Sequence, residues 1–306
     1  MKYFIITVDT EGDNLWAYNG GKITTNNSKY IPRFQNLCNK FNLKPVYLTN
    51  YEMVNDDYFV EYIKGVLKNN QCEVGMHLHA WNSPPFYKLE KKYDGNPFLV
   101  EYPEEIMELK IKNMLELLEK KIGTKIISHR AGRWIINDLY FKVLKKYGLK
   151  VDCSVTPFVD YSKTQGRTQF GIDYKKYKKD CSYIYNNILE VPMSIRKFRY
   201  FSQGSLKHRA RVLLKGNNIW LRPALSTLEE MKKAINKIEK ESDYLEFMIH
   251  SSELMPGGSP YFKEEKDIEK LYDSMKELFI YAIKKGYKGI TLKDYYNIKK
   301  KGNKKA

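Results

Sequence analysis

The chain has 306 residues, of which 42% are hydrophobic and 14% aromatic, and this length and composition favour one elaborated domain with a sizeable core. No stretch approaches the roughly 18 consecutive apolar residues of a membrane-spanning helix, and residues 1–6 begin a strand instead of a signal peptide. These features predict a cytoplasmic protein without a transmembrane segment.

The formal net charge of +17 raises the question of a nucleic-acid or membrane partner. The lysines, however, are spread over most of the predicted helices and loops, and no zinc-finger, helix-turn-helix or RNA-recognition signature accompanies them. We therefore interpret the charge as a solvated surface and expect no nucleic-acid partner. An anionic partner remains open, such as an acidic glycan, a nucleotide-linked sugar or a membrane surface contacted peripherally.

Strand-like apolar runs alternate with helical periodicity along nearly the whole chain. The predicted strands are residues 3–8, 45–49, 73–78, 125–128, 149–154, 188–191, 218–221, 245–249 and 287–290. The predicted helices are residues 31–41, 57–68, 103–121, 137–147, 227–241 and 267–285. This α/β order implies parallel strands with helices outside them.

The regularity lapses between about 157 and 216, a stretch rich in tyrosine and lysine that we interpret as an irregular insertion over one face of the domain. Loops on the C-terminal face of a barrel supply specificity, so we expect this insertion to border the site and contact an anionic, lipid-linked or nucleotide-linked part of the substrate. The lysines concerned are Lys175, Lys176, Lys178 and Lys179. A single domain is expected over residues 1–295, followed by a basic, disordered tail at 296–306.

The four cysteines are widely spaced and form no CxxC motif: Cys38, Cys72, Cys153 and Cys181. Two of them, Cys72 and Cys153, lie in apolar runs typical of strands. We therefore expect buried thiols in a reducing compartment and no cysteine ligand to a metal.

The most informative motif is an apolar strand pattern that ends in two histidines, His77 and His79. Side chains two residues apart in a strand point to the same side, so two imidazoles can bind one ion at about 2.0–2.1 Å each. The first predicted strand ends in two acids, Asp9 and Glu11, which offer further ligands. The two strand ends predict a metal site built from imidazoles and carboxylates.

Other unusual polar residues also fall where predicted strands end, which is where parallel barrels build their sites. They are His129 and Arg130 after the fourth strand, Asp152 and Ser154 at the fifth, Arg222 after a later strand and His250 after strand 245–249. Small residues separate the cations Arg130 and Arg133 beside Trp134, so this loop can approach a ligand closely.

With these residues in place, the chain resembles the polysaccharide deacetylase family, the NodB-homology or carbohydrate-esterase group, from residue 1 to about 290. The motifs that match the family's order are Val8 to Gly12, Gly75 to His79, Arg130 to Trp134, Val151 to Pro157 and Phe247 to His250. Thr10 separates the two acids of the first motif, and Trp81 stands where the family commonly has its second metal histidine. The likeness is closer to the divergent branch with an Asp-x-Glu first motif, found in surface-polysaccharide and O-antigen synthesis.

The resemblance implies a distorted (β/α)7-type barrel in which Glu11, His77 and His79 hold a divalent ion. Zn²⁺ suits these ligands, and Fe, Co and Ni also take them. It implies Asp9 as the catalytic base, Arg130 as the partner that keeps Asp9 ionised, and His250 as the acid that protonates the departing amine. The expected substrate contacts are Trp81, Arg133, Trp134, Asp152 and Arg222.

We therefore expect a metal-dependent hydrolase that removes an acetyl group from an N-acetylated sugar or glycan during synthesis of a surface glycan. The sugar could be free, nucleotide-linked or lipid-linked. The alternative is a non-catalytic carbohydrate-binding or assembly protein that retains the barrel.

Overall fold

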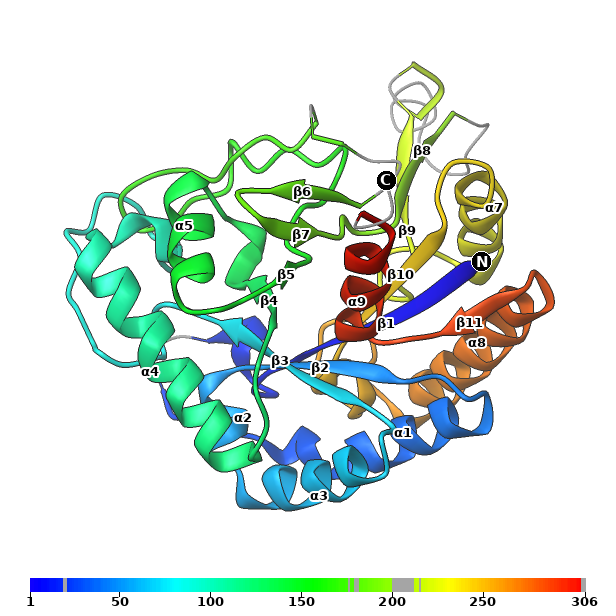
Figure 1. Ribbon diagram of the computed structural model, residues 1–306, viewed down its shortest axis with the longest axis horizontal. Coiled ribbons are helices and arrows are strands. Elements are labelled where there is room, and N and C mark those ends of the chain that lie inside the picture. The colour runs from blue at the N-terminus through cyan, green and yellow to red at the C-terminus, as the bar shows by residue number, and fades with distance from the viewer. Residues whose placement is uncertain (19–20, 176, 179–181, 200–211, 215, 304–306) are drawn as a thin grey trace.

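The computed structural model describes residues 1–18, 21–175, 177–178, 182–199, 212–214 and 216–303. Its main sheet is mostly parallel and curls into a barrel with helices outside it (Figure 1). The strand order is β10-β1-β2-β3-β4-β5-β7-β6, with β11 also paired to β1, and β8 and β9 form a separate antiparallel pair. The bounds are β1 Lys2–Thr10, β2 Pro45–Thr49, β3 Glu73–Leu78, β4 Ser128–Ala131, β5 Val151–Asp152, β6 Tyr183–Tyr185, β7 Ile188–Glu190, β8 Ile195–Phe198, β9 Asn217–Trp220, β10 Tyr244–His250 and β11 Tyr287–Gly289.

Several helices begin or end at capping residues. Asp56 accepts a hydrogen bond from the Phe59 N–H at the start of α3, Thr227 and Glu230 form a capping box at the start of α7, and Gly123 ends α4 at φ 80°. The bounds are α1 Ile31–Lys40, α2 Tyr51–Val54, α3 Asp57–Lys68, α4 Glu104–Ile122, α5 Asp138–Lys146, α7 Leu228–Ile238, α8 Glu265–Lys284 and α9 Leu292–Asn303. Short 3₁₀ turns are η1 Leu15–Ala17, η2 Asn26–Tyr30, η3 Leu99–Glu101, η4 Gly132–Trp134 and η5 Ser251–Leu254.

Single hydrogen bonds close the barrel between β7 and β10. The Leu221 N–H donates to the carbonyl oxygen of Ser194 at 3.1 Å, and the Met248 N–H of β10 donates to the carbonyl oxygen of Leu221 at 3.0 Å. Ser194 lies just before β8 and Leu221 just after β9. Among the described residues, the ring continues there through irregular backbone, which distorts the barrel.

The barrel interior is apolar at the end where the strands begin. Tyr3, Val46, Val151 and Tyr244, each near the start of its strand, form one cluster with Tyr295 of α9. Helix α9 thus lies across this end of the barrel and closes it (Figure 1). A separate and larger apolar cluster packs the outer face of the sheet against the helices. Burial on both faces explains why the central strands are near-continuous apolar runs.

These observations confirm the predicted α/β barrel with parallel strands and an irregular insertion. The predicted fourth strand needs correction, because β4 begins at Ser128, so that His129 and Arg130 lie within the strand and not after it. The insertion contains the β6–β7 hairpin, which extends the main sheet, and the start of the β8–β9 pair.

The expected disordered tail also needs correction, because α9 continues to Asn303. This helix is held by the buried ring of Tyr295 and by the ion pair from Lys299 Nζ to Asp243 at 2.8 Å. A basic sequence can still form a helix when one face covers an apolar surface. Residues 304–306 lie outside the described part of the chain.

The lysines of the insertion are only partly described. Lys175 Nζ pairs with Asp160 at 2.9 Å and Asp173 at 3.1 Å, within the insertion itself, whereas Lys176 and Lys179 lie outside the described residues. Contact of this segment with an anionic substrate stays a prediction. The expected buried thiols are found at Cys38, Cys72 and Cys153, and Cys181 lies outside the described residues.

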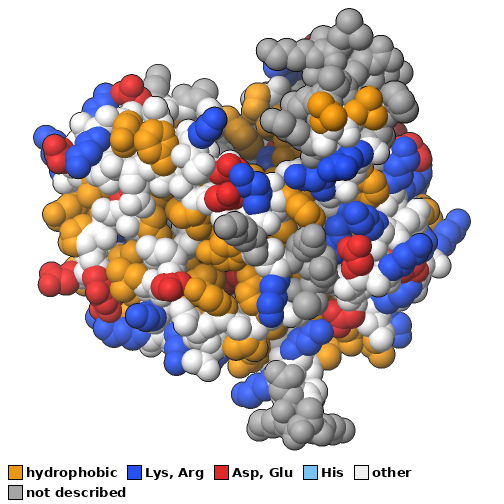
Figure 2. All heavy atoms as spheres, turned by 90° about the horizontal axis from the view of Figure 1, so that it is seen from above, with side chains coloured by type: hydrophobic (Ala, Val, Ile, Leu, Met, Phe, Trp, Pro, Cys, Tyr) orange, Lys and Arg blue, Asp and Glu red, His pale blue; other side chains and the backbone are white. Residues whose placement is uncertain are grey.

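On the face drawn in Figure 2, lysine and arginine side chains are dispersed among acidic and apolar ones, as expected for a solvated basic surface. None of the helices in the described part of the chain combines the length and apolar composition needed to cross a bilayer.

Lys110 of α4 is a fully buried cation that holds the loop after β3. Its Nζ donates to the carbonyl oxygens of Ala80, Ser83 and Pro85 at 2.9, 2.6 and 2.7 Å. Burial lowers the pKa of Lys110 to about 8, so the ammonium form with three donors persists at neutral pH. The loop it holds includes Trp81.

Lys110→Met should lower the free energy of unfolding by about 3 kcal/mol, because three buried carbonyl oxygens lose their donor. Urea denaturation measures this loss. The matched control is Lys112→Met, since Lys112 is exposed on the same helix and forms only an i,i+4 contact with Glu116 at 3.9 Å. Equal losses in the two variants would contradict the role assigned to Lys110.

Candidate metal centre

Glu11 follows β1, and its backbone is fixed from two sides. Ser251 Oγ, just past β10, accepts a hydrogen bond from the Glu11 N–H at 3.1 Å, and Asn27 Nδ2 donates to the Glu11 carbonyl oxygen at 2.7 Å. The next amide, of Gly12, donates to Glu52 Oε1 at 2.7 Å. The carboxylate of Glu11 is therefore set in place by neighbouring strands and loops.

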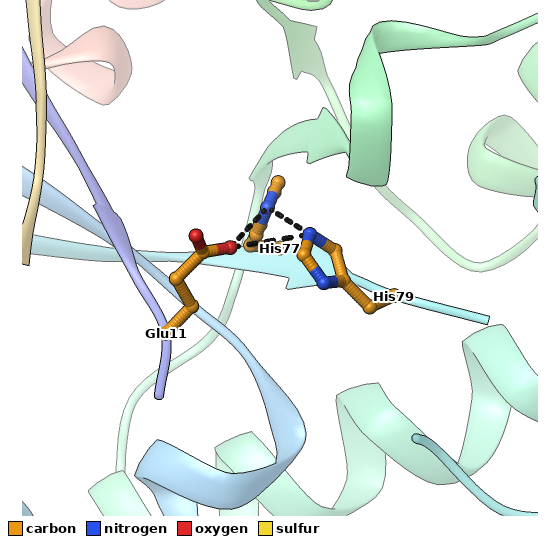
Figure 3. A group of neighbouring side chains, drawn as sticks. All are labelled: Glu11, His77 and His79. Atoms are coloured by element: carbon orange, nitrogen blue, oxygen red, sulfur yellow. Dashed lines mark hydrogen bonds and ion pairs between the residues drawn. The ribbon is translucent and has the colours of Figure 1, made fainter. Parts of the chain in front are cut away.

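The imidazoles of His77 and His79 meet this carboxylate (Figure 3). Glu11 Oε2 lies 3.5 Å from His77 Nε2 and 3.2 Å from His79 Nε2, and the two Nε2 atoms are 3.0 Å apart. A tetrahedral ion with ligands at about 2.0–2.1 Å holds its ligand atoms about 3.3 Å apart. The three side chains therefore match three corners of a tetrahedral site, which leaves the fourth corner open.

The hydrogen bonds around these histidines leave the facing nitrogens available to a cation. His77 Nδ1 donates to the carbonyl oxygen of Arg130 at 2.9 Å, which leaves the lone pair on Nε2. Burial, together with His77, His250 and Arg133, holds the pKa of His79 well below its usual range, so this imidazole is neutral. Two such nitrogens beside a carboxylate form a ligand set that suits Zn²⁺ or a similar ion.

When no ion is bound, the carboxylates of this site favour a proton on His77. Burial acts to lower the pKa of His77, but the neighbouring carboxylates of Asp9 and Glu11 outweigh it and raise that pKa above its ordinary value. The side chains are thus arranged to stabilise positive charge at this point.

Asp9 lies two residues before Glu11 and is held apart from the ligand group. Arg130 Nη1 donates to Asp9 Oδ1 at 2.5 Å. Burial would raise the pKa of Asp9, but the guanidinium of Arg130, assisted by His77 and His250, holds it below its usual range. Asp9 is therefore an ionised carboxylate beside the candidate metal position, and its second oxygen is not bonded to Arg130.

His250 ends β10 on the opposite side of the site. Its Nε2 lies 3.8 Å from both Asp9 Oδ2 and Glu11 Oε1. Its Nδ1 accepts from Arg222 Nη2 at 3.0 Å, and the same nitrogen of Arg222 donates to Glu253 Oε1 at 2.7 Å. Because Nδ1 is an acceptor here, the ring N–H is on Nε2 and faces the two carboxylates.

These groups line a cavity of about 260 Å³ that is walled by three indoles. Trp16 packs edge-on against His250 with ring centroids 5.0 Å apart, Trp81 lies against His79 at 4.3 Å, and Trp134 forms a third wall. A larger cavity, about 420 Å³, lies at the opposite end of the barrel among α3, α4 and α9, away from the ligand group found in the described residues.

Most of the residues predicted for the site are brought together. The cavity is lined by Asp9, Glu11, His77, His79, Trp81, Arg133, Trp134 and His250, and Arg130 lies directly beneath Asp9. Arg133 also links two loops beside the cavity. Its guanidinium donates hydrogen bonds to the carbonyl oxygen of Asn96 and, at 2.9 Å, to that of Gln165.

Two predicted substrate contacts do not line the cavity. Asp152 is fully buried and bonds His129 Nδ1 at 2.6 Å and Ser154 Oγ at 2.8 Å. Its strand neighbours Val151 and Cys153 belong to the interior cluster, so alternation turns Asp152 to the outer face. Arg222 lies behind His250 and Trp16, donating to the imidazole and lying over the indole ring 5.8 Å from its centroid, and does not itself line the cavity. Neither residue is retained as a substrate contact.

Three residues near the site were missed in the sequence. Trp16 lies five residues after Glu11, and Glu253 lies three residues after His250 and bonds its backbone N–H at 3.0 Å. Glu52 lies half-buried behind the ligand group, and desolvation raises its pKa to about 7. Trp16 and Glu253 lie close in sequence to the predicted motifs, whereas Glu52 has no such signal, and none of the three belongs to a periodic pattern.

No family model and no curated protein matches the chain. Among solved structures, a branching enzyme from Thermococcus kodakaraensis in complex with glucose matches at 9% identity and TM-score 0.54, covering 97% of this chain and 71% of its own. This likeness shows a shared fold.

Deacetylase-type structures are also found. A protein from Mycobacterium smegmatis assigned to the polysaccharide deacetylases matches at 14% identity and TM-score 0.48, covering 91% of this chain and 84% of its own. A family 4 acetyl xylan esterase from Clostridium thermocellum, solved with a cobalt ion, matches at 14% identity and TM-score 0.48, covering 97% and 92%. Polysaccharide deacetylases are among the structures to which this chain is similar.

The geometry predicts stoichiometric binding of one Zn²⁺ whose affinity weakens as the pH falls from about 8 to about 6, because the raised pKa of His77 makes a proton compete for its Nε2. Isothermal titration at several pH values measures this dependence. The control is a double variant, His77→Ala with His79→Ala, which should bind no stoichiometric ion. Stoichiometric binding by that variant would refute the ligand assignment.

Proposed function

We propose that this protein is a metal-dependent hydrolase that removes the acetyl group from an N-acetylated sugar. The observation that carries the proposal is the pairing of two features in one cavity. One is the ligand group Glu11, His77 and His79, whose geometry leaves coordination positions open. The other is Asp9, an ionised carboxylate that lies beside this group without belonging to it.

Glu11, His77 and His79 would hold a divalent ion, most simply Zn²⁺, with Fe, Co or Ni as alternatives. When bound, such an ion polarises a carbonyl oxygen and lowers the pKa of its water. The donor set fits the ion, because two imidazoles and one carboxylate converge at distances suited to a single tetrahedral centre.

Asp9 would act as the general base. Its Oδ1 is occupied by Arg130 and its Oδ2 lies on the cavity side, 3.8 Å from His250 Nε2. A carboxylate kept ionised by a buried guanidinium can accept a proton at neutral pH. Arg130 therefore serves catalysis by keeping Asp9 charged and oriented.

His250 would supply a proton to the departing amine once it is protonated on both ring nitrogens, with the second proton on Nδ1 facing Glu253 Oε1 at 3.5 Å. Its Nε2–H faces the space between Asp9 and Glu11, and Arg222 with Glu253 fixes the ring from behind. The base and the acid thus approach the same cavity from β1 and β10, neighbouring strands whose Asp9 and His250 are register partners.

The sugar would lie between the indoles, whose flat faces suit a pyranose ring. Trp81 and Trp134 were predicted to make these contacts and line the cavity together with Trp16. The substrate is proposed to be a sugar of a surface glycan under synthesis in the cytoplasm, either free or linked to a nucleotide or lipid. Acetate release from a panel of N-acetylated sugars, measured with added Zn²⁺ and with a chelator, tests the proposal.

The two acids should respond differently to isosteric substitution. Asp9→Asn should retain bound metal and lose roughly 10²–10⁴-fold in kcat, because the base is removed and the ligands remain. Glu11→Gln should weaken metal affinity by at least about tenfold. Loss of a residue that only supports a metal ligand typically costs about 10–100-fold in affinity, and Glu11 is itself a ligand. Metal content and kcat of both variants give the comparison. The opposite pattern would mean that ligand and base are exchanged.

A further inference from the structure

The guanidinium of Arg130 is shared between two buried carboxylates. Nη1 donates to Asp9 Oδ1 at 2.5 Å, whereas Nη2 donates to Glu246 Oε1 and, at 2.9 Å, to Thr7 Oγ1. Nε donates to the carbonyl oxygen of Cys153 at 3.2 Å. Each nitrogen therefore has its own acceptor, and the side chain is fully buried.

Glu246 lies on β10, opposite Ile5 of β1 in the ladder, four residues before His250. It is fully buried and uses only Oε1, since Oε2 has no hydrogen-bond partner among the described residues. Burial raises the pKa of Glu246 to about 7 despite the opposing effect of Arg130. An incompletely paired carboxyl group at this depth costs stability, which suggests a purpose other than packing.

The contact between Arg130 and Asp9 has an unusual form for such a pair. Guanidinium and carboxylate groups frequently pair through two parallel hydrogen bonds. Here Asp9 receives one bond, because Nη2 of Arg130 is engaged by Glu246 and Thr7. Asp9 Oδ2 consequently stays unbonded to Arg130, on the side of His250.

We infer that Glu246 is a positioning residue that draws Arg130 away from two-bond pairing with Asp9 and so leaves one oxygen of Asp9 free to accept a proton. Nη2 carries two hydrogens, so without the acceptor at residue 246 one can stay on Thr7 Oγ1 while the other turns to Asp9 Oδ2 and occupies it. The inference rests on the proposed function for its catalytic meaning, but the geometric effect on Arg130 can be tested independently.

Two substitutions separate this role from simple packing. In Glu246→Leu, the crystal structure should show Arg130 with two hydrogen bonds to Asp9, and kcat should fall roughly 10–100-fold with KM and metal affinity unchanged. In Glu246→Gln, the amide oxygen can still accept from Nη2, so the single-bond geometry and most of kcat should be kept. If the leucine variant does not fold, Glu246→Asp replaces it, because its shorter carboxylate cannot reach Nη2.

Glu241→Gln is the matched control, since Glu241 pairs with the buried Arg196 at 2.6 Å away from the cavity. It should lower stability without changing kcat per folded enzyme. A single Arg130–Asp9 bond in the leucine or aspartate variant would overturn the inference, as would equal kcat losses in that variant and Glu246→Gln. The crystal structures decide the matter even if the chain proves to have no deacetylase activity, which would refute only the proposed function.

Discussion

The guanidinium of Arg130 crosses the interior of the barrel and joins strands that are not neighbours. From β4 it reaches Asp9 and Thr7 on β1 and Glu246 on β10. Breaking a buried ion pair by removing one partner typically costs about 3–5 kcal/mol, because the other charge is left unpaired. The position of Asp9 at the cavity floor therefore depends on a residue more than a hundred positions away in the chain.

The interior of the barrel is layered, and the layering explains why the charges lie where they do. Tyr295 of α9 seals the apolar end, Arg130 and Glu246 form a polar layer above it, and the histidines and acids of the candidate metal centre lie above that. Water is excluded from the middle layer, so each charge there acts strongly on its neighbours. The result is a site that holds Asp9 ionised and attracts a proton or cation to His77.

Much of the site could be predicted because its residues follow strand periodicity. The i, i+2 spacing of His77 and His79 guarantees that both face one side, and β3 has the predicted bounds. His129 and Asp152 show the limit of this reasoning, because a shift of one residue in a strand sends a side chain to the other face. Both residues point to the outer face, where His129 Nε2 bonds the Tyr140 hydroxyl at 2.8 Å.

Residues that support others were not predictable from the sequence. Glu246 lies in an apolar strand. Its proposed positioning role depends on its contact with Arg130, which reaches it from a strand distant in the sequence. Trp16 and Glu52 reach the site from η1 and α2, short helical segments that are too brief to show a periodic pattern. Catalytic and ligand residues can thus be predicted from residue type and spacing. The residues that position them can be identified once the folded barrel shows which strands lie together.

The central claim is that Glu11, His77 and His79 bind one metal ion, with Asp9 beside it and not in contact. Anomalous diffraction at the zinc edge from crystals grown with Zn²⁺ tests this most directly. The account predicts a single strong peak at about 2.0–2.1 Å from Glu11 Oε2 and both Nε2 atoms, with the Arg130–Asp9 bond intact. A peak bound instead by Asp9, or none at these three side chains, would contradict it.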